Sequence, residues 1–227
     1  MKLLVLDVEG TIFKPGIRLP GTSLSSTIWQ AIAHALGPQA VCEEIQTHDR
    51  WSNGKYDSYL DWMEDTILIH REYGLKQQEF NSLIAAAEYN QGVLETLSQI
   101  DQNQFEIVLI SGGFRELAAR AQRDLGIRHA FAACEYLFGE DGVLHAFNLL
   151  PCDFEGKIDF IRLLLREHKL SHNDWFFVGD GANDAPVATE APVSIGYRPH
   201  PHLSEVCDFV ISDFADLLSI LLTGTQP

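Results

Sequence analysis

The sequence contains three short apolar runs, and polar or glycine-rich residues close each of them. The runs are Leu3–Val8, which carries Asp7 near its end, Phe105–Ile110 and Trp175–Val178. Runs this short, rich in Leu, Val, Ile and Phe, predict strands that are buried on both faces, as in a parallel sheet. Helical periodicity follows the second and third runs, so strand–turn–helix units repeat along the chain. We therefore expect an α/β fold with a doubly wound, mainly parallel, Rossmann-like sheet.

A long stretch between the first two runs, roughly residues 14–97, has helical rather than strand-like periodicity. Its apolar side chains recur at spacings of three and four residues, as they do along one face of a helix. Proline and glycine residues near its start, at 15–21, and the segment 90–92 are candidate hinges. We therefore expect two domains: a discontinuous core of residues 1–14 and 92–227, and an inserted helical cap of residues 15–91.

The remaining elements follow from the same local patterns. An Asp-Gly pair between two apolar runs, at Asp141-Gly142, indicates a β-hairpin. The expected elements are helices at Phe114–Leu125, Glu155–His168, Asn183–Glu190 and Phe214–Leu222, a hairpin at Tyr136–Leu150, and strands at Val193–Ile195 and Phe209–Ile211.

Composition limits the possible partners. The 227 residues are 46% hydrophobic, which is enough for a full core, and 16 basic against 32 acidic residues give a net charge of −16. Such a chain repels nucleic acid and anionic membranes, so we expect neither as a partner, and any phosphate site must be locally positive. The four cysteines are scattered, which favours reduced thiols and a cytoplasmic location. The first apolar run is too short for a signal peptide or a membrane span. A monomer and a homodimer are both compatible with the sequence.

Four groups of polar residues follow the predicted strands in a fixed order. They are Asp7-Val8-Glu9-Gly10-Thr11, Ser111-Gly112-Gly113, Lys157 near the start of a helix, and Gly179-Asp180-Gly181-Ala182-Asn183-Asp184. Each group alone is weak, because an Asp at a strand end is often a simple turn former or helix cap. Together they resemble the four signature motifs of haloacid-dehalogenase-like phosphatases, over nearly the whole chain. The helical insert and the last group are most similar to the phosphoserine-phosphatase branch.

This resemblance implies a phosphatase that forms an aspartyl-phosphate, with Asp7 as the nucleophile. Phosphoryl transfer needs an in-line nucleophile and charge neutralisation on the transferred oxygens. Mg²⁺ prefers oxygen ligands, and Asp7 and Asp180 supply two carboxylates from neighbouring strand ends. The resemblance implies the backbone carbonyl of Glu9 as a third ligand, with Asp184 holding the metal or its waters from outside.

The substrate's phosphate group needs hydrogen-bond donors and positive charge. Ser111 offers a hydroxyl, and Gly112 offers a backbone N–H that we expect at a helix N-terminus, where the dipole favours anions. Lys157 supplies a point charge that offsets the repulsion between Asp7 and the phosphate. Asn183 is expected to add an amide contact to the phosphate or to Lys157.

Glu9 is the notable departure from the family pattern, in which an Asp usually stands two residues after the nucleophile. That residue protonates the leaving group and then activates water. A glutamate is one methylene longer, which changes the geometry of proton transfer. The enolase-phosphatase of methionine salvage is similar in carrying Glu here. We therefore expect Glu9 to act as the general acid and base, with a misplaced and inactive Glu9 as the alternative.

The substrate is expected to be a small phosphate monoester other than phosphoserine. Phosphoserine phosphatases use a glutamate shortly after the first motif and an arginine from the cap. Here the segment Ile12–Arg18 has no acid, and Tyr56–Asp65 has no arginine. Other basic cap residues remain candidates for an anionic group of the substrate: Arg18, Arg50, Lys55 and Arg71.

Two rival functions stay open on the sequence. A phosphotransferase or mutase on the same scaffold would pass the phosphoryl group to an acceptor other than water. A non-catalytic module that binds a phosphorylated ligand would result if the change at Glu9 had disabled turnover.

Overall fold

The computed structural model describes residues 1–18 and 25–223, with the side chains of Ser25 and Ser26 left out. The expected hinge at Pro20-Gly21 lies outside the described residues. The chain divides into two compact units. The first, here called the core unit, holds residues 1–14, 89–133 and 150–227; the second, the helical unit, holds residues 15–88 and 134–149.

A seven-stranded sheet has the order β6-β5-β4-β1-β7-β8-β9, and its strands belong to the core unit except for β6 and the second half of β5. The pairs β1/β4, β1/β7, β7/β8 and β8/β9 are parallel, whereas β5 and β6 are antiparallel. The predicted mainly parallel α/β class is confirmed. The strands are β1 (Lys2–Leu6), β4 (Phe105–Phe114), β5 (His129–Phe138), β6 (Leu144–Leu149), β7 (Trp175–Gly179), β8 (Ser194–Tyr197) and β9 (Phe209–Ile211).

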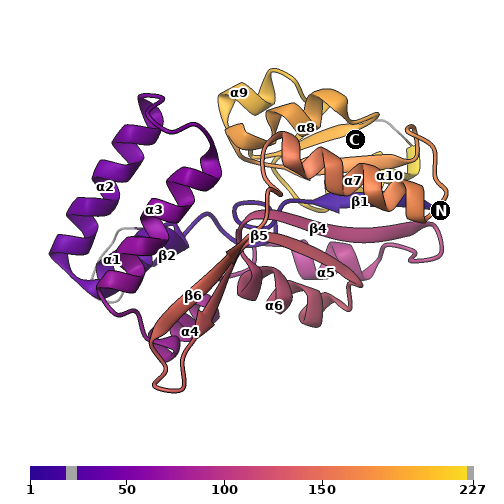
Figure 1. The fold of residues 1–227 in the computed structure, drawn as a ribbon. Coiled ribbons are helices and arrows are strands. Elements are labelled where there is room, and N and C mark those ends of the chain that lie inside the picture. The colour runs from indigo at the N-terminus through magenta and orange to yellow at the C-terminus, as the bar shows by residue number, and fades with distance from the viewer. Residues whose placement is uncertain (19–24, 224–227) are drawn as a thin grey trace. The chain divides into compact units, whose positions relative to one another are not determined.

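Strand β1 lies at the centre of this sheet, between β4 and β7 (Figure 1). Its residues Leu3–Leu6 are fully buried, and so is most of β7, which explains the unbroken apolar runs of both strands. Helices α5 and α6 cover one face of the sheet, and α7 and α8 cover the other. The core-unit helices are α5 (Val93–Ser98), α6 (Arg115–Leu125), α7 (Glu155–Glu167), α8 (Ala185–Glu190), α9 (Pro201–Ser204) and α10 (Asp216–Thr223), with a 3₁₀ turn η1 (Ala182–Asp184) before α8.

Four helices and two short strands make up most of the helical unit. Thr27 and Ser58 cap two of these helices, because each side chain accepts a backbone N–H from three residues further on. Because of its two short strands, the insert is not purely helical, contrary to expectation. Its elements are β2 (Ile17–Arg18), β3 (Ser25–Ser26), α1 (Ile28–Leu36), α2 (Pro38–Ser52), α3 (Tyr59–Glu72) and α4 (Gln77–Ala86).

The predicted hairpin forms between β5 and β6. Its turn closes by hydrogen bonds from Gly139 N to Val143 O and from Gly142 N to Gly139 O, both 2.9 Å long. Gly142 has a φ of 72°, a conformation that favours glycine. The hairpin segment 134–149 belongs to the helical unit. This grouping differs from the expected domain at 15–91, whose boundaries stay a prediction.

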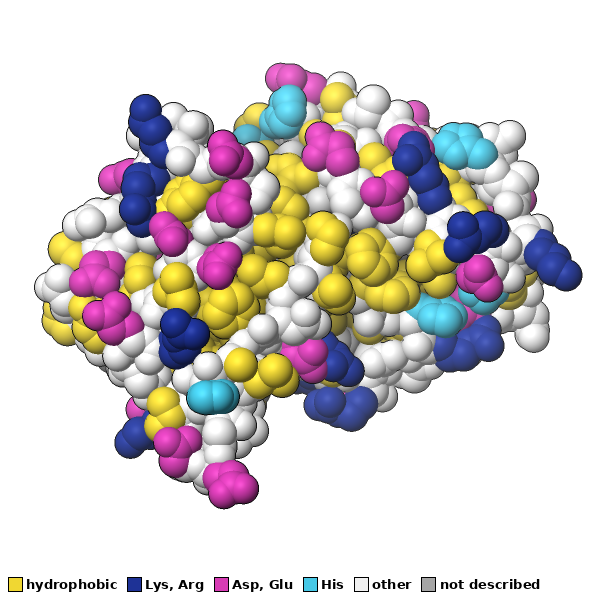
Figure 2. Space-filling view, viewed as in Figure 1, with side chains coloured by type: hydrophobic (Ala, Val, Ile, Leu, Met, Phe, Trp, Pro, Cys, Tyr) yellow, Lys and Arg dark blue, Asp and Glu magenta, His cyan; other side chains and the backbone are white. Residues whose placement is uncertain are grey.

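The surface agrees with the acidic composition. Asp and Glu side chains are spread over the face drawn in Figure 2. Among the described residues, no helix combines the length and the apolarity needed to cross a membrane. All four cysteines are free, as expected, and two of them, Cys134 and Cys152, are buried.

Candidate active site

Asp7 follows the last residue of β1 and is only 6% exposed. Its backbone N–H donates to Val178 O of β7 at 2.9 Å, so the sheet continues to hold Asp7 after the strand ends. The carboxyl ends of β1 and β7 lie side by side because the two strands are parallel. Ligands of doubly wound sheets bind at such an edge.

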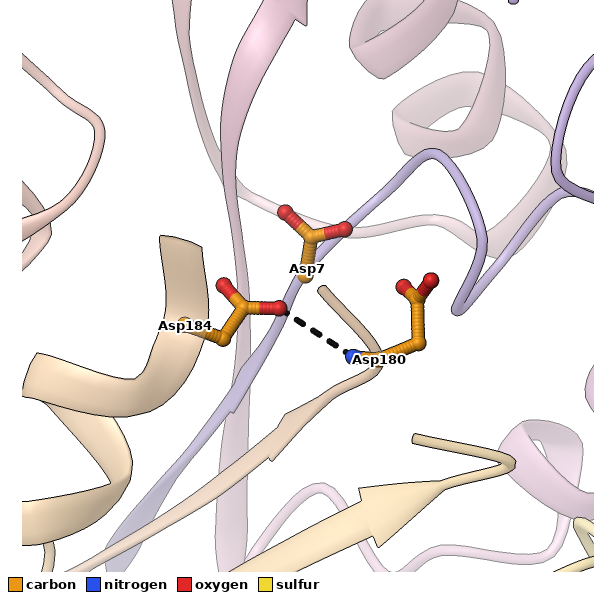
Figure 3. Close-up of side chains that lie close together, drawn as sticks. All are labelled: Asp7, Asp180 and Asp184. Carbon is orange, nitrogen blue, oxygen red and sulfur yellow. Dashed lines mark hydrogen bonds between the residues drawn. The ribbon is translucent and has the colours of Figure 1, made fainter. Parts of the chain in front are cut away.

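Three carboxylates meet at this edge. Asp7, Asp180 and Asp184 each offer an oxygen, and the three oxygens lie within 4.8 Å of one another. Figure 3 shows them coming from the end of β1, from the turn after β7 and from η1 at the start of the next helix. The structure therefore brings together the three acidic residues that the sequence predicts at one site.

Two features hold Asp180 in place. The Thr11 hydroxyl donates to its Oδ1 at 2.9 Å. Gly10 has a φ of 99°, and a Cβ built there would lie 2.0 Å from Oδ2 of Asp180. Only glycine combines this backbone conformation with room for the carboxylate.

Asp184 is fully buried and anchors the glycine-rich loop. Its Oδ2 accepts the backbone N–H groups of Asp180 and Gly181, each at 3.1 Å. The first of these bonds is the dashed line in Figure 3. Because Oδ2 is occupied in this way, Oδ1 is the oxygen that contacts the lysine described next.

Lys157 is fully buried and bridges two of the carboxylates. Its Nζ donates to Oδ1 of Asp7 and to Oδ1 of Asp184, both at 2.6 Å. Burial alone disfavours the charged ammonium, but the carboxylates of Asp184, Asp7 and Asp153 raise the pKa of Lys157 well above its ordinary value. The predicted helix lysine is therefore a buried cation within the carboxylate cluster.

Ser111 and Gly112 lie in the last residues of β4, not in a helix. The strand runs on to Phe114, and helix α6 begins at Arg115. The expectation that Gly112 offers its N–H at a helix N-terminus is therefore wrong. The strand continues because Phe114 is buried and keeps an extended backbone, with a φ of −84° and a ψ of 135°. The Ser111 hydroxyl accepts the N–H of Gly113 at 3.0 Å.

The Glu9 side chain is half-buried and is directed toward the end of β4. Its Oε2 lies 3.9 Å from the position that a Cβ at Gly113 would take. The first motif and the Ser111 segment are therefore neighbours in space, as the resemblance implied.

Asn183, expected to contact the phosphate or Lys157, has Asp153 as its protein partner. Its amide Nδ2 donates to Oδ1 of Asp153 at 2.8 Å, and no hydrogen bond joins it to Lys157 among the described residues. Asp153 was not among the predicted site residues. The sequence signal that could have found it is its position four residues before Lys157, one helical turn away.

Asn90 is a second residue that sequence analysis missed, since it was assigned only to a hinge. Its buried side-chain amide donates to three backbone carbonyls of the loop after β1, those of Gly10, Thr11 and Phe13, at 2.7 to 3.0 Å. One side chain therefore fixes the loop that carries Glu9.

Mutual repulsion and burial perturb the acids of the cluster. Burial, with the neighbouring charges of Asp184 and Asp180, raises the pKa of Asp7 well above its ordinary value. Burial, followed by the charge of Asp184, raises the pKa of Asp180 to about 7. Both shifts reflect carboxylates that are close together and shielded from water, with Lys157 as the cation that opposes them.

These residues fit a hard divalent cation. Carboxylate oxygens are the ligands that Mg²⁺ prefers, whereas zinc sites draw on Cys and His. A cation between Asp7 and Asp180 would also relieve the repulsion that raises both pKa values.

Comparison with known proteins identifies the family. The haloacid dehalogenase-like hydrolase family matches residues 1–191. The chain belongs to this family. It is 28% identical over 220 residues to a phosphoserine phosphatase of Lactococcus lactis, covering 96% of this chain and 93% of that protein. A phosphoserine phosphatase of Wolinella succinogenes is 27% identical over 97% of this chain and 98% of that protein.

Solved structures agree with this assignment at the level of the fold. A crystal structure of phosphoserine phosphatase in its apo form has a TM-score of 0.75 at 21% identity, with 98% of each chain covered. A structure described as a phospho-aspartyl intermediate analogue of phosphoserine phosphatase gives 0.72 at 21% identity, with 97% of each chain covered. The predicted family and its phosphoserine-phosphatase-like branch are confirmed. The family and these relatives support the predicted enzyme class, a phosphoric monoester hydrolase.

Proposed function

We propose that this hydrolase is a Mg²⁺-dependent phosphatase that cleaves a small phosphate monoester through an aspartyl-phosphate on Asp7. The observation that carries the proposal is the buried ammonium of Lys157, 2.6 Å from both Asp7 and Asp184 at the carboxyl end of the central strand. A buried cation held between carboxylates at a sheet edge suits a site for a phosphate ester.

The metal would be held by the carboxylates of Asp7 and Asp180 and by the backbone carbonyl of Glu9, with Asp184 supporting it from outside. When bound, Mg²⁺ neutralises negative charge on the phosphate oxygens. Asp180 is prepared for this role by the Thr11 hydroxyl, which fixes one of its oxygens.

The phosphoryl group is transferred in two displacements at phosphorus. A carboxylate oxygen of Asp7 attacks the phosphorus while the ester P–O bond breaks, and the Glu9 carboxyl gives its proton to the departing oxygen. The Glu9 carboxylate then takes a proton from water, which attacks the phosphorus and releases inorganic phosphate and free Asp7. The Ser111 hydroxyl, the Gly112 N–H, Lys157 and the Asn183 amide hold the phosphate oxygens during both displacements.

Phosphoserine is proposed to be a poor substrate, although the relatives are phosphoserine phosphatases by name. The segment Ile12–Arg18 contains no carboxylate for an amino group. In the helical unit, the Arg50 guanidinium lies 3.2 Å from Asp65 and over the ring of Tyr56, so its charge is already offset. Helix α3 carries a single arginine, Arg71, in its last turn.

A screen over many phosphate esters tests the function. We expect hydrolysis with Mg²⁺, loss of hydrolysis with a chelator, and a rate for phosphoserine below that of the best ester. Binding of phosphate esters without hydrolysis of any of them would contradict the proposal and favour a ligand-binding module. Transfer to an added alcohol in preference to water would favour a phosphotransferase.

Asp7→Asn tests the nucleophile. The amide keeps the shape of the side chain but cannot accept the phosphoryl group, so kcat should fall by at least roughly a thousandfold. Asp159→Asn is the matched control, because the Asp159 side chain is 77% exposed on α7 and the same chemical change there should leave kcat unaltered. Turnover that survives in Asp7→Asn would refute the assignment.

Glu9→Gln tests proton transfer separately from metal binding. We expect kcat to fall by about 10²-fold or more, because glutamine cannot donate the proton or take it back. Mg²⁺ affinity, measured by calorimetry, should stay unchanged since the proposed metal ligand is the backbone carbonyl. An unaltered kcat would rule out the acid and base role of Glu9.

A further inference from the structure

Asp153 is a buried carboxylate beside the phosphate-binding residues, and it has no role in the chemistry proposed above. It lies in the loop between β6 and α7, and it is 8% exposed. Charged side chains are rarely buried without a partner, so its contacts indicate what holds it there.

The Asp153 carboxylate contacts two residues of the site through the same oxygen. Its Oδ1 accepts the Asn183 amide at 2.8 Å and lies 3.6 Å from Nζ of Lys157. The Oδ1 of Asn183 lies close to Gly181, where a Cβ would come within 2.1 Å of it. The amide is oriented with Nδ2 facing the acceptor oxygen of Asp153.

The second oxygen of Asp153 lies against Gly112. A Cβ built on Gly112 would come within 2.1 Å of Oδ2 of Asp153, so the carboxylate occupies the space that any larger residue at 112 would need. Asp153 thus touches three of the four groups proposed to hold the phosphate: Gly112, Lys157 and Asn183.

The backbone next to Asp153 is held in a rarely populated conformation. Phe154 has a φ of 48°, one of three non-glycine residues with positive φ among those described. Gly156 N donates to Asp153 O at 2.9 Å and closes the turn into α7. Such outliers persist where the surrounding structure over-determines them, as it does at functional sites.

We propose that Asp153 is a positioning residue that sets the Asn183 amide at the phosphate. This inference rests on the proposed function and adds to it a residue that never touches the substrate. Because one Asn183 N–H is spent on Asp153, the other is directed by the planar amide and is available to a phosphate oxygen. Asp153 acts through the hydrogen bond that it accepts rather than through its charge, which by itself would repel the phosphate.

Two substitutions separate the hydrogen bond from the charge. Asp153→Asn keeps an oxygen for Asn183 and removes the charge, whereas Asp153→Ala removes both. For Asp153→Ala we expect KM for p-nitrophenyl phosphate and the inhibition constant of inorganic phosphate to rise about tenfold, the loss of one hydrogen bond to the phosphate. For Asp153→Asn we expect both constants to stay near those of the wild type or to fall, because the repulsion is gone.

The comparison of the two variants decides the proposal. If Asp153→Ala leaves both constants unchanged, or if Asp153→Asn weakens phosphate binding as much as Asp153→Ala does, the positioning role is refuted. A purely structural role would lower the melting temperature of both variants without moving the inhibition constant. Asp159→Ala, on the solvent face of α7, is the control.

A double-mutant cycle with Gly112→Ala gives a second test that does not depend on one variant. Gly112→Ala alone should displace Asp153 and weaken phosphate binding. Once Asp153→Ala has vacated the space, adding Gly112→Ala should cost less than it does in the wild type. Additive effects in this cycle would contradict the contact on which the inference depends.

The result also distinguishes this inference from the proposed function. If the wild type neither hydrolyses p-nitrophenyl phosphate nor binds inorganic phosphate, the proposed function fails and this inference fails with it. If the wild type does both and Asp153→Ala behaves like the wild type, only the role of Asp153 is overturned.

Discussion

At the scale of single residues, the site depends on positions where a side chain is missing. Gly10, Gly112 and Gly179 each face a carboxylate so closely that a Cβ would lie between 2.0 and 2.5 Å from one of its oxygens. Heavy atoms in proteins do not approach this closely without displacement. The glycines therefore set how near the acidic side chains come to the backbone of the motifs.

Gly10→Ala should disturb the site more than an ordinary glycine substitution does. Its new Cβ would collide with Asp180, and the φ of 99° is strained for alanine. We expect the unfolding free energy to fall by about 3 kcal/mol, with weaker Mg²⁺ binding. Chemical denaturation and metal titration measure the two effects.

Gly126→Ala is the matched control for that prediction. Gly126 also has positive φ, 68°, but a Cβ there meets nothing within 4 Å. Only the backbone strain remains, so the cost should be about 1 kcal/mol with Mg²⁺ affinity unchanged. An equal loss of unfolding free energy in Gly10→Ala and Gly126→Ala would show that Asp180 moves away from the new Cβ at no energetic cost.

At the scale of elements, the loop after β1 is held by a residue from the segment before α5. Asn90→Ala removes the side-chain donor that serves three backbone carbonyls. We expect a loss of about 2 to 4 kcal/mol in unfolding free energy, and a fall in kcat of about tenfold because Glu9 loses its support. Denaturation and steady-state kinetics test this.

An exposed asparagine provides the comparison. Asn53 donates to the Asp49 carbonyl at the end of α2 and is solvent-exposed. Asn53→Ala should cost less than about 0.5 kcal/mol and leave kcat alone. If Asn90→Ala were equally mild, the loop would hold its shape through its backbone hydrogen bonds alone.

The elements also show how far the sequence could predict this site. The positions of Asp7 and Asp180 were predictable because buried parallel strands leave unbroken apolar runs, and the ends of those strands meet at one edge. Lys157, on helix α7, was singled out only by its place in the order of the four motifs. Asn90 was not, because its backbone partners lie up to 80 residues away and no local pattern marks it. Asp153 was missed because its Asn183 partner lies 30 residues away, and only its spacing of four residues from Lys157 hinted at it. The extension of β4 through Gly112 was missed because glycines after an apolar run usually indicate a turn.

At the scale of the whole molecule, the stability of the chain should depend on a histidine in the helical unit. His70 is fully buried, its Nδ1 lies 2.7 Å from the Tyr136 hydroxyl, and its Nε2 has no hydrogen-bond partner among the described residues. Burial lowers the pKa of His70 from 6.5 to about 3. The folded chain therefore keeps this imidazole neutral at a pH where the unfolded chain protonates it.

The sign of the pH dependence follows from that shift. The contribution of His70 is fully present above pH 6.5 and is lost as the pH falls from 6.5 toward about 3, by about 1.4 kcal/mol per pH unit. His70→Asn keeps a polar atom for Tyr136 but cannot take up the proton. The difference in unfolding free energy between the wild type and His70→Asn should change with pH at this slope. A difference that stays constant with pH would contradict the prediction.

The buried lysine has a consequence for the proposed metal site when no cation occupies it. An ammonium that already bridges two of the acidic side chains serves as a resident counter-ion when no Mg²⁺ is present. We therefore expect a chelator to abolish activity without unfolding the protein. Adding Mg²⁺ back should restore activity without a refolding step. Lys157→Met would remove this counter-ion, so the folded state of the variant should depend on the metal as well as its activity.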